Sequence, residues 1–172
     1  EIVFGDWMSE VCSSDLDQYS LSSLVWAWQY NSLSSQIIKT LKYKGSFDIS
    51  EEIVNLLLSR LSKANFLEQF KNPLLVPVPL HKKKERKRGF NQAELIGRSL
   101  SENLNLPFST DLLVRSVYNK PQAEKNKLQR EEISSKTFVF DLDKYEREYN
   151  GKEIILVDDV ITTGSTLDAA SI

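Results

Sequence analysis

The stretch Ile154-Ile155-Leu156-Val157-Asp158-Asp159-Val160-Ile161-Thr162-Thr163-Gly164-Ser165-Thr166 decides the fold of this chain. It begins with a continuous apolar run, which is typical of a strand that is covered on both faces. Two adjacent carboxylates follow where that strand should leave the sheet, and a turn rich in hydroxyl groups then leads into residues that can begin a helix. In α/β folds, ligands bind beyond the carboxyl ends of the strands. The stretch therefore predicts a parallel sheet with a ligand site at this edge.

The hydroxyl-rich turn is suited to bind a phosphate dianion. Side-chain hydroxyls, free backbone N–H groups and the positive end of a helix dipole come together there, and Gly164 lets the backbone approach closely. Asp158 and Asp159 can accept hydrogen bonds from the vicinal hydroxyls of a ribose, or hold Mg2+ through oxygen ligands. A single turn or acidic pair is usually structural, but the conjunction favours a ribose 5-phosphate site. Its predicted residues are Asp158, Asp159, Thr162, Thr163, Gly164, Ser165 and Thr166.

The rest of the chain alternates between strand and helix patterns. Strands are expected at 74–80, 112–115, 137–140 and 154–157. Helices are expected at 34–43, at 49–63 with the apolar stripe Ile53, Leu56, Leu57 and Leu61, and at 92–103 with Asn91 as its cap. Strands that alternate with helices imply an α/β fold, in which a parallel sheet has helices on both faces. We expect 74–80 and 154–157 to be neighbouring interior strands of this sheet.

Composition limits the class of protein. The chain has 172 residues, of which 41% are hydrophobic and 27% charged, as in a single globular domain with a buried core. Its net charge of -2 argues against a protein that coats nucleic acid with its whole surface. One cysteine and one histidine cannot form a disulfide or a zinc site of four nitrogen or sulfur ligands. With no membrane span and no signal peptide in the sequence, we expect a cytoplasmic protein.

Both ends of the chain look incomplete. Residues 5–16 have neither helical nor strand periodicity, and 11–16 resemble a translated sequencing adapter. We therefore expect residues 1–19 to be a non-native or disordered segment, and residues 20–172 to form the domain. At the other end the chain stops a few residues into the helix expected after Gly164. We expect a domain truncated at its C-terminal end, as a fragment of a longer protein.

Several segments resemble a known family. The stretch 154–166 resembles the phosphoribosyl pyrophosphate signature of type I phosphoribosyltransferases. From about Tyr30 to its end, the chain also resembles the ComF family, the competence-associated group within that fold. The matching segments are Leu41-Lys42-Tyr43-Lys44-Gly45, Val76-Pro77-Val78-Pro79-Leu80, Arg86-Lys87-Arg88-Gly89-Phe90-Asn91-Gln92, and Pro121-Gln122 with Arg130 and Phe138. The chain departs from the family at Ile133, where an Asn is expected, and lacks both the cysteine-rich zinc segment that often precedes this domain and its last helix and strand.

The resemblance implies roles for the basic residues. Residues 82–88 hold six cations in seven positions, a pattern usually typical of a solvated surface. The resemblance implies instead a loop that meets the pyrophosphate of the substrate, where cations stabilise the departing negative charge. The candidate pyrophosphate-binding residues are Arg86, Arg88, Gly89, Lys42 and Lys44, of which the last two could equally be ordinary helix-end cations. Residues 82–84 are expected to be solvated or to touch a polyanion, and His81 to be a loop residue rather than a base.

The leading functional prediction is a phosphoribosyltransferase that binds phosphoribosyl pyrophosphate and Mg2+. Pyrophosphate leaves C1 through a cationic ribosyl transition state, while an acceptor that the sequence does not identify attacks. Asp158 and Asp159 are the candidate catalytic residues, because their charge can stabilise the ring. The loop at 122–130 resembles the hood that closes over such sites and excludes water.

Two other functions are open to this sequence. One is a non-catalytic accessory protein of competence or DNA uptake, whose basic loop contacts single-stranded DNA or a helicase partner. A negative net charge and few aromatic residues near the basic run make base stacking weak in this alternative. The other is a phosphoacceptor receiver domain, which also carries acids at strand ends. Those acids are expected near the start of such a domain, whereas Asp158 and Asp159 lie near the end of this chain.

Overall fold

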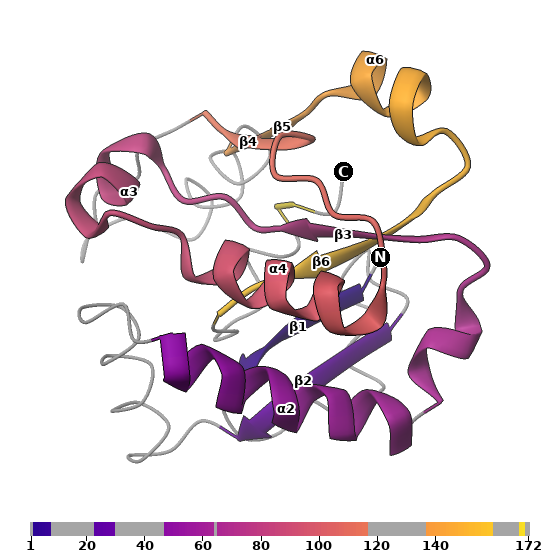
Figure 1. Cartoon of the computed structure of the whole chain (residues 1–172). Helices are drawn as coiled ribbons and strands as arrows, with labels where there is room; N and C mark the ends of the chain where they lie inside the picture. Colours follow the sequence, from indigo (N-terminus) through magenta and orange to yellow (C-terminus); the bar gives the residue numbers. More distant parts are fainter. Residues whose placement is uncertain are drawn as a thin grey trace, which may run out of the picture.

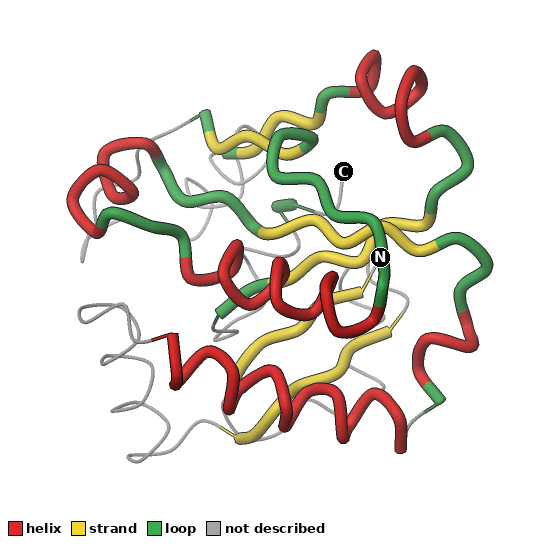
Figure 2. Tube along the Cα trace, in the orientation of Figure 1, coloured by secondary structure: helices red, strands yellow, loops and turns green. Residues whose placement is uncertain are grey.

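The computed structural model of this chain describes residues 2–7, 23–29, 47–63, 65–116, 137–159 and 169–170. Figure 1 labels the elements along the chain, and Figure 2 shows how strands and helices alternate. They are β1 (Ile2–Trp7), β2 (Ser23–Gln29), α2 (Phe47–Lys63), the 3-10 helix η2 (Phe66–Gln69), β3 (Pro73–Pro77), α3 (Lys82–Arg88), α4 (Gln92–Leu104), β4 (Leu113–Arg115), β5 (Phe138–Phe140), α6 (Leu142–Lys144), the π-helical turn η3 (Tyr145–Tyr149) and β6 (Glu153–Val157). The helix expected at 34–43 and the hood expected at 122–130 lie outside the described residues.

The central sheet has four strands in the order β2-β1-β6-β3. Every neighbouring pair in it is parallel, so all four carboxyl ends lie at one edge, beyond which α3 follows β3 (Figure 1). In the register of β3 and β6, Leu75 lies opposite Ile155 and Pro77 lies opposite Val157. The predicted α/β fold with a parallel sheet is therefore confirmed, and so is the pairing of the two apolar runs.

Strand β3 differs from the expectation in one respect, because within the described residues it ends the four-stranded sheet instead of lying inside it. Among the residues that the structure describes, its outer edge makes an isolated bridge between Leu75 and Phe108. There the Leu75 N–H donates to the Pro107 carbonyl at 3.0 Å, and the Ser109 N–H donates to the Leu75 carbonyl at 3.0 Å. A strand that contains proline lacks N–H donors for a full ladder on both sides. The edge position of β3 follows from its two prolines.

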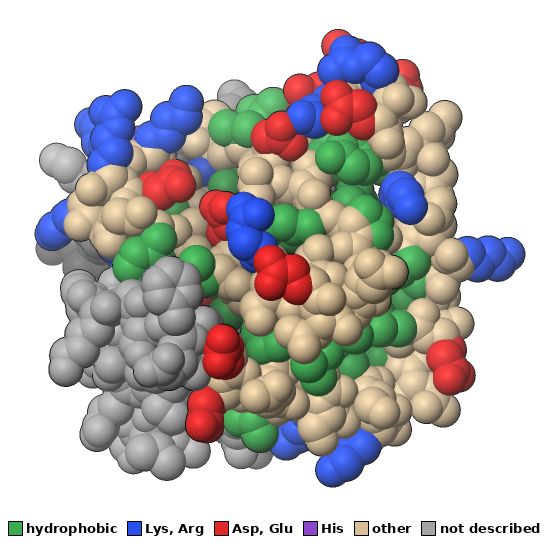
Figure 3. Space-filling view, in the orientation of Figure 1, with side chains coloured by type: hydrophobic (Ala, Val, Ile, Leu, Met, Phe, Trp, Pro, Cys, Tyr) green, Lys and Arg blue, Asp and Glu red, His purple; other side chains and the backbone are tan. Residues whose placement is uncertain are grey.

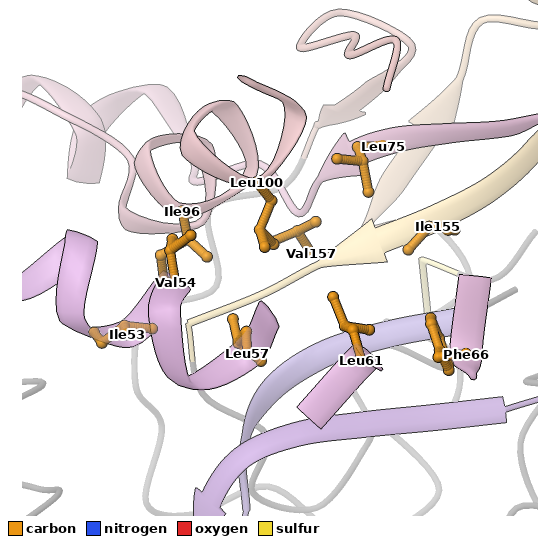
Figure 4. Packing of buried hydrophobic residues seen from close by; sticks show 10 residues of the cluster. All are labelled: Ile53, Val54, Leu57, Leu61, Phe66, Leu75, Ile96, Leu100, Ile155 and Val157. Carbon is orange, nitrogen blue, oxygen red and sulfur yellow. The ribbon is translucent and has the colours of Figure 1, made fainter. Parts of the chain in front are cut away.

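Helices α2 and α4 pack together on one face of the sheet (Figure 1). The core beneath them contains Ile53, Val54, Leu57, Leu61, Phe66, Leu75, Ile96, Leu100, Ile155 and Val157, shown in Figure 4. The expected stripe of α2 is wrong at Leu56, whose side chain is 49% exposed. Residues 53, 54, 57 and 61 span only about 100° of a helix, and Leu56 falls outside this arc. The face of α2 that meets the sheet is therefore narrower than the expected stripe and is rotated toward Val54.

The opposite face of β3 and β6 is covered differently. Strands β4 and β5 form a separate antiparallel pair, and their residues Leu113 and Phe138 join a second core with Leu74, Val76 and Leu156. Partly buried Tyr145 and Tyr149, from the helical segment formed by α6 and η3, pack against this core, as do the buried residues Ala169 and Ala170. Helical segments thus lie on both sides, but the two-stranded sheet supplies much of the second layer. Among the described helices, none combines the length and the apolar character needed to cross a bilayer.

The N-terminal segment also differs from expectation. Residues Ile2–Trp7 form β1, which lies between β2 and β6, whereas we expected no order before about residue 20. In this strand Ile2, Val3 and Phe4 lie opposite Ile155, Leu156 and Val157. An apolar triplet at a chain end is too short to be recognised as a strand until a partner edge is known. Whether residues 1–19 are native, and where the domain begins, stay predictions.

Candidate functional site

Asp158 and Asp159 follow β6 directly, at the carboxyl edge of the parallel sheet. The side chain of Asp158 is buried and that of Asp159 is half-buried. One carboxylate oxygen of Asp158 accepts a hydrogen bond from the Asp159 N–H at 2.8 Å, which orients the carboxylate. The structure therefore places both acids where the sequence predicts them. Their ligand-binding and catalytic roles stay predictions.

Other predicted site residues cannot be placed. The hydroxyl-rich turn Thr162, Thr163, Gly164, Ser165 and Thr166 lies outside the described residues, and so do Lys42 and Lys44. The described part of the site consists of the acids, the basic segment and the residues around them.

The end of β3 and the start of α4 are tied to the same edge as the acids. The Val78 N–H donates to the Val157 carbonyl at 2.8 Å, which continues the pairing of the two strands up to Asp158. The Asn91 amide then donates to the Val78 carbonyl at 3.1 Å. Its oxygen accepts from the Ala93 N–H at 3.2 Å, which confirms Asn91 as the cap of α4. Through these bonds, the first turn of α4 is anchored beside the carboxyl end of β6.

The basic segment is a helix, α3, and the expectation of a loop is wrong. His81 caps its N-terminus, since the imidazole Nδ1 accepts a hydrogen bond from the Lys83 N–H at 3.1 Å. Gly89 ends it with a φ of 85°, a left-handed conformation that glycine adopts without strain. With a cap at each end and good helix formers between them, the segment folds despite its charge density. The cations in its last turn also suit the helix dipole.

No residue of α3 is buried, and its lysines and arginines gather at the upper left of Figure 3. The two predicted pyrophosphate ligands on this helix differ in their surroundings. Arg86 is exposed, whereas Arg88 is half-buried and donates from Nη1 to Oε1 of Gln92 at 3.1 Å. Arg88 is therefore held against the first turn of α4, while Arg86 extends from the outer surface of α3.

Gln92 is a residue that the sequence analysis did not single out. Its side chain is 1% exposed at the first position of α4. While Oε1 accepts from Arg88, the buried Nε2 has no hydrogen-bond partner among the described residues. Gln92 thus fixes Arg88 and keeps one donor available beside it. Its signals in the sequence are its place directly after the helix cap and its position at the end of the segment 86–92 that resembles the ComF family.

Arg115, at the end of β4, is the second residue that the sequence analysis missed. Its Cζ lies 5.2 Å from the centroid of the Phe138 ring, and its side chain is half-buried. Burial lowers the pKa of Arg115, and the nearby carboxylate of Asp158 acts in the opposite direction. Partial burial lowers the pKa of His81 as well, with further contributions from the cations Lys83, Arg115 and Lys84. Arg115 therefore lies within electrostatic range of both Asp158 and His81, the cap of α3.

Asp158 and Asp159 offer two carboxylates that could bind Mg2+. Among the described residues, no three His, Cys, Asp or Glu side chains gather into a group that could hold a metal. Mg2+ usually keeps several waters and takes one or two carboxylates together with phosphate oxygens of a substrate. Asp158 and Asp159 match the carboxylate part of that donor set. They fit Mg2+ on condition that a ligand and water supply the remaining oxygens.

Comparison with known proteins identifies the family. Residues 88–171 match the family described as the phosphoribosyl transferase domain. The chain is 30% identical to competence protein F of Haemophilus influenzae over 167 residues, which are 96% of this chain and 72% of that protein. This chain belongs to the ComF family. Competence protein ComFC of Bacillus subtilis, another relative, is 33% identical over 144 residues, which are 84% of this chain and 54% of that protein.

A third relative of this ComF-family chain is DNA utilization protein YhgH of Escherichia coli. It is 28% identical over 134 residues, which are 77% of this chain and 57% of that protein. The chain thus spans little more than half the length of the Bacillus and Escherichia proteins. No solved structure matches it. The predicted ComF resemblance and phosphoribosyltransferase-type domain are confirmed, and the matched region includes Arg88, Arg115, Asp158 and Asp159.

Proposed function

We propose that this ComF-family chain is the ligand-binding part of a phosphoribosyltransferase, which binds phosphoribosyl pyrophosphate with Mg2+ and transfers the phosphoribosyl group to an acceptor. One observation carries the proposal: the carboxylate of Asp158 is buried at the end of β6 and lies within electrostatic range of the half-buried Arg115 guanidinium. A ligand that fits both groups needs hydroxyls for the acid and phosphate for the cation. A phosphorylated ribose has both.

The acids would serve the ribose. Asp158 and Asp159 would accept hydrogen bonds from its hydroxyls and stabilise the positive charge that develops on the ring as the bond from C1 to pyrophosphate breaks. The hydrogen bond from the Asp159 N–H already orients the Asp158 carboxylate. Such preorganisation lowers the cost of reaching the transition state.

The anionic ends of the ligand would be bound separately. We assign the 5-phosphate to the turn at 162–166 and the pyrophosphate to Arg86 and Arg88, with Gly89 allowing close approach. Mg2+, held by Asp158 and Asp159 together with ligand oxygens, would neutralise part of the phosphate charge. Because Arg88 is braced by Gln92, it would meet the pyrophosphate with less loss of side-chain entropy than the exposed Arg86.

The test is calorimetry on the full-length protein with Mg2+ present. We expect phosphoribosyl pyrophosphate to bind more tightly than ribose 5-phosphate, and ribose 5-phosphate more tightly than ribose. The double variant Asp158→Asn with Asp159→Asn should reduce turnover at least tenfold. This loss should exceed its loss of affinity for ribose 5-phosphate if the acids act on transition-state charge. The control, Asp143→Asn with Glu146→Gln, removes the same charge from two exposed positions and should change neither quantity.

A second candidate function is an accessory role in DNA uptake. Two observations favour it: the exposed cations of α3, and the printed names of the relatives, which refer to competence and DNA utilization. A full-length protein that binds no phosphoribosyl pyrophosphate with Mg2+, but binds single-stranded DNA through α3, would replace the transferase proposal with this one.

A further inference from the structure

The charged groups at the carboxyl edge arrive from two faces of the sheet. Ile96 and Leu100 of α4 pack with Leu75 and Val157 in the first core. Leu113 of β4 packs in the second core. Since the side chains of a strand alternate between faces, α4 and β4 cover opposite faces. Arg115, which ends β4, therefore reaches the edge from the face opposite Gln92 and its partner Arg88.

The side chain of Arg115 is half-buried at this edge. Among the described residues, its guanidinium makes no hydrogen bond or ion pair, and its contact is with the Phe138 ring. A guanidinium has five donors, and leaving them unsatisfied in a half-buried place costs free energy. Such a cost is expected where a ligand supplies the missing acceptors.

Arg98 provides an internal comparison. Its Cζ also lies over an aromatic ring, 5.5 Å from the centroid of Phe108. Arg98, however, is exposed and is paired with Glu94 at 2.9 Å. Each of these two arginines therefore lies over an aromatic ring. Among the described residues, however, Arg98 forms an ion pair with a carboxylate, whereas Arg115 has the charge of Asp158 nearby without a hydrogen bond or an ion pair to it. A purely structural role for the stacked guanidinium does not account for this difference.

We propose that Arg115 is a ligand-binding residue of this site and binds the pyrophosphate end of the ligand from the face opposite α4. The inference rests on the proposed function and adds a residue to it. A pyrophosphate between Arg115 and Arg88 would be clamped by guanidinium groups from both faces, while the ribose hydroxyls meet Asp158. Guanidinium is suited to this role because its fork donates two parallel hydrogen bonds to phosphate oxygens.

The experiment compares Arg115→Gln and Arg115→Lys with Arg98→Gln in the full-length protein. Calorimetry with Mg2+ uses inorganic pyrophosphate, phosphoribosyl pyrophosphate and ribose 5-phosphate as probes. We expect Arg115→Gln to weaken the two pyrophosphate-bearing probes at least tenfold and ribose 5-phosphate less than threefold. The affinity of Arg115→Lys for these two probes should lie between those of the wild type and Arg115→Gln, because lysine keeps the charge but cannot donate two parallel hydrogen bonds. Arg98→Gln should bind all three probes like the wild type.

Thermal unfolding without ligand distinguishes a loss of binding contacts from a loss of folded protein in these variants. Arg115→Gln should keep the wild-type melting temperature or exceed it, because the variant removes a desolvated cation. Wild-type affinity for pyrophosphate in both Arg115 variants would overturn the assignment. So would a loss of affinity explained by a smaller folded fraction. A wild-type protein that binds neither phosphoribosyl pyrophosphate nor pyrophosphate would refute the proposed function itself, whereas the Arg115 assignment alone fails if the wild type binds and the variants bind equally.

Discussion

At the scale of single residues, His81 combines a structural task with a sensitivity to pH. Its Nδ1 accepts a hydrogen bond from the Lys83 N–H and thereby caps α3. A nitrogen that accepts a hydrogen bond cannot carry a proton, so doubly protonated imidazole would lose this cap. Partial burial and the cations Lys83, Arg115 and Lys84 lower the pKa of His81 and favour the neutral ring.

This arrangement predicts a pH-dependent stability. The folded protein holds the pKa of His81 below its ordinary value of 6.5, so the unfolded chain binds a proton first as pH falls. The stabilisation is therefore complete above about pH 6.5 and is lost as pH falls through the folded pKa. Thermal unfolding at several values between about pH 7 and pH 5 should show a falling melting temperature in the wild type and a smaller fall in His81→Asn.

Asparagine is a suitable replacement because its side-chain oxygen caps a helix at any of these pH values. His81 is the only histidine of the chain, so the variant leaves no other imidazole to titrate in this range. An identical pH dependence in the two proteins would show that the cap contributes nothing to it.

At the scale of elements, α2 shows how far sequence periodicity can locate a buried face. Adjacent residues Leu56 and Leu57 are 49% and 2% exposed, respectively. A period of 3.6 residues allows either leucine to lie in the stripe, because both have apolar neighbours three or four positions away. Which of the two leucines is buried depends on the sheet and α4, because these elements cover only one arc of the helix.

This difference predicts unequal costs of truncation. Leu57→Ala should lower the free energy of unfolding by about 2–5 kcal/mol, because it leaves a cavity in the core between the sheet and the helices. Leu56→Ala, at an exposed position of the same helix, should change it by about 0.5 kcal/mol or less. Urea unfolding of both variants checks the pair. Equal losses would mean that the face of α2 that meets the sheet is not the one described.

At the scale of the whole molecule, the parallel sheet brings separate segments to one edge. Asp158 follows β6 directly, α3 follows β3, and Arg115 is the last residue of β4. A hydrogen bond from the Val78 N–H connects the end of β3 to β6, and one from the Asn91 amide connects the start of α4 to the end of β3. An acidic subsite for hydroxyls therefore lies beside cations that suit phosphate, although the chain as a whole has a net charge of only -2.

This arrangement predicts that the cations of α3 are not equivalent. The double variant Arg86→Gln with Arg88→Gln should lower the affinity for phosphoribosyl pyrophosphate at least tenfold. Its affinity for ribose 5-phosphate should stay nearly unchanged, since only the former ligand carries pyrophosphate. Lys82→Gln with Lys87→Gln removes the same charge from exposed positions of the same helix and should weaken both ligands only slightly, through long-range attraction. Calorimetry measures all four affinities. Equal losses for the two ligands in the arginine variant would contradict the assignment to pyrophosphate.

Much of the fold could be predicted from local signals. The apolar run 154–157, the adjacent acids and the Asn91 cap depend on residues that are close in the chain, so the sequence displays them directly. The same holds for Gly89, whose freedom at positive φ matches the end of α3. The helical state of α3 was missed because a dense charge run usually indicates a solvated loop, while its cap is an uncommon one, His81.

The sequence by itself determined the α/β class, the pairing of two apolar strands and the position of Asp158 and Asp159 at the end of one of them. Tertiary structure alone decided that β3 ends the described sheet, that Leu56 faces outward, that Gln92 braces Arg88, and that Arg115 comes near Asp158. The physical reason is that these features depend on contacts between elements far apart in the chain. Local propensity and periodicity describe one element at a time and carry no information about which faces will meet.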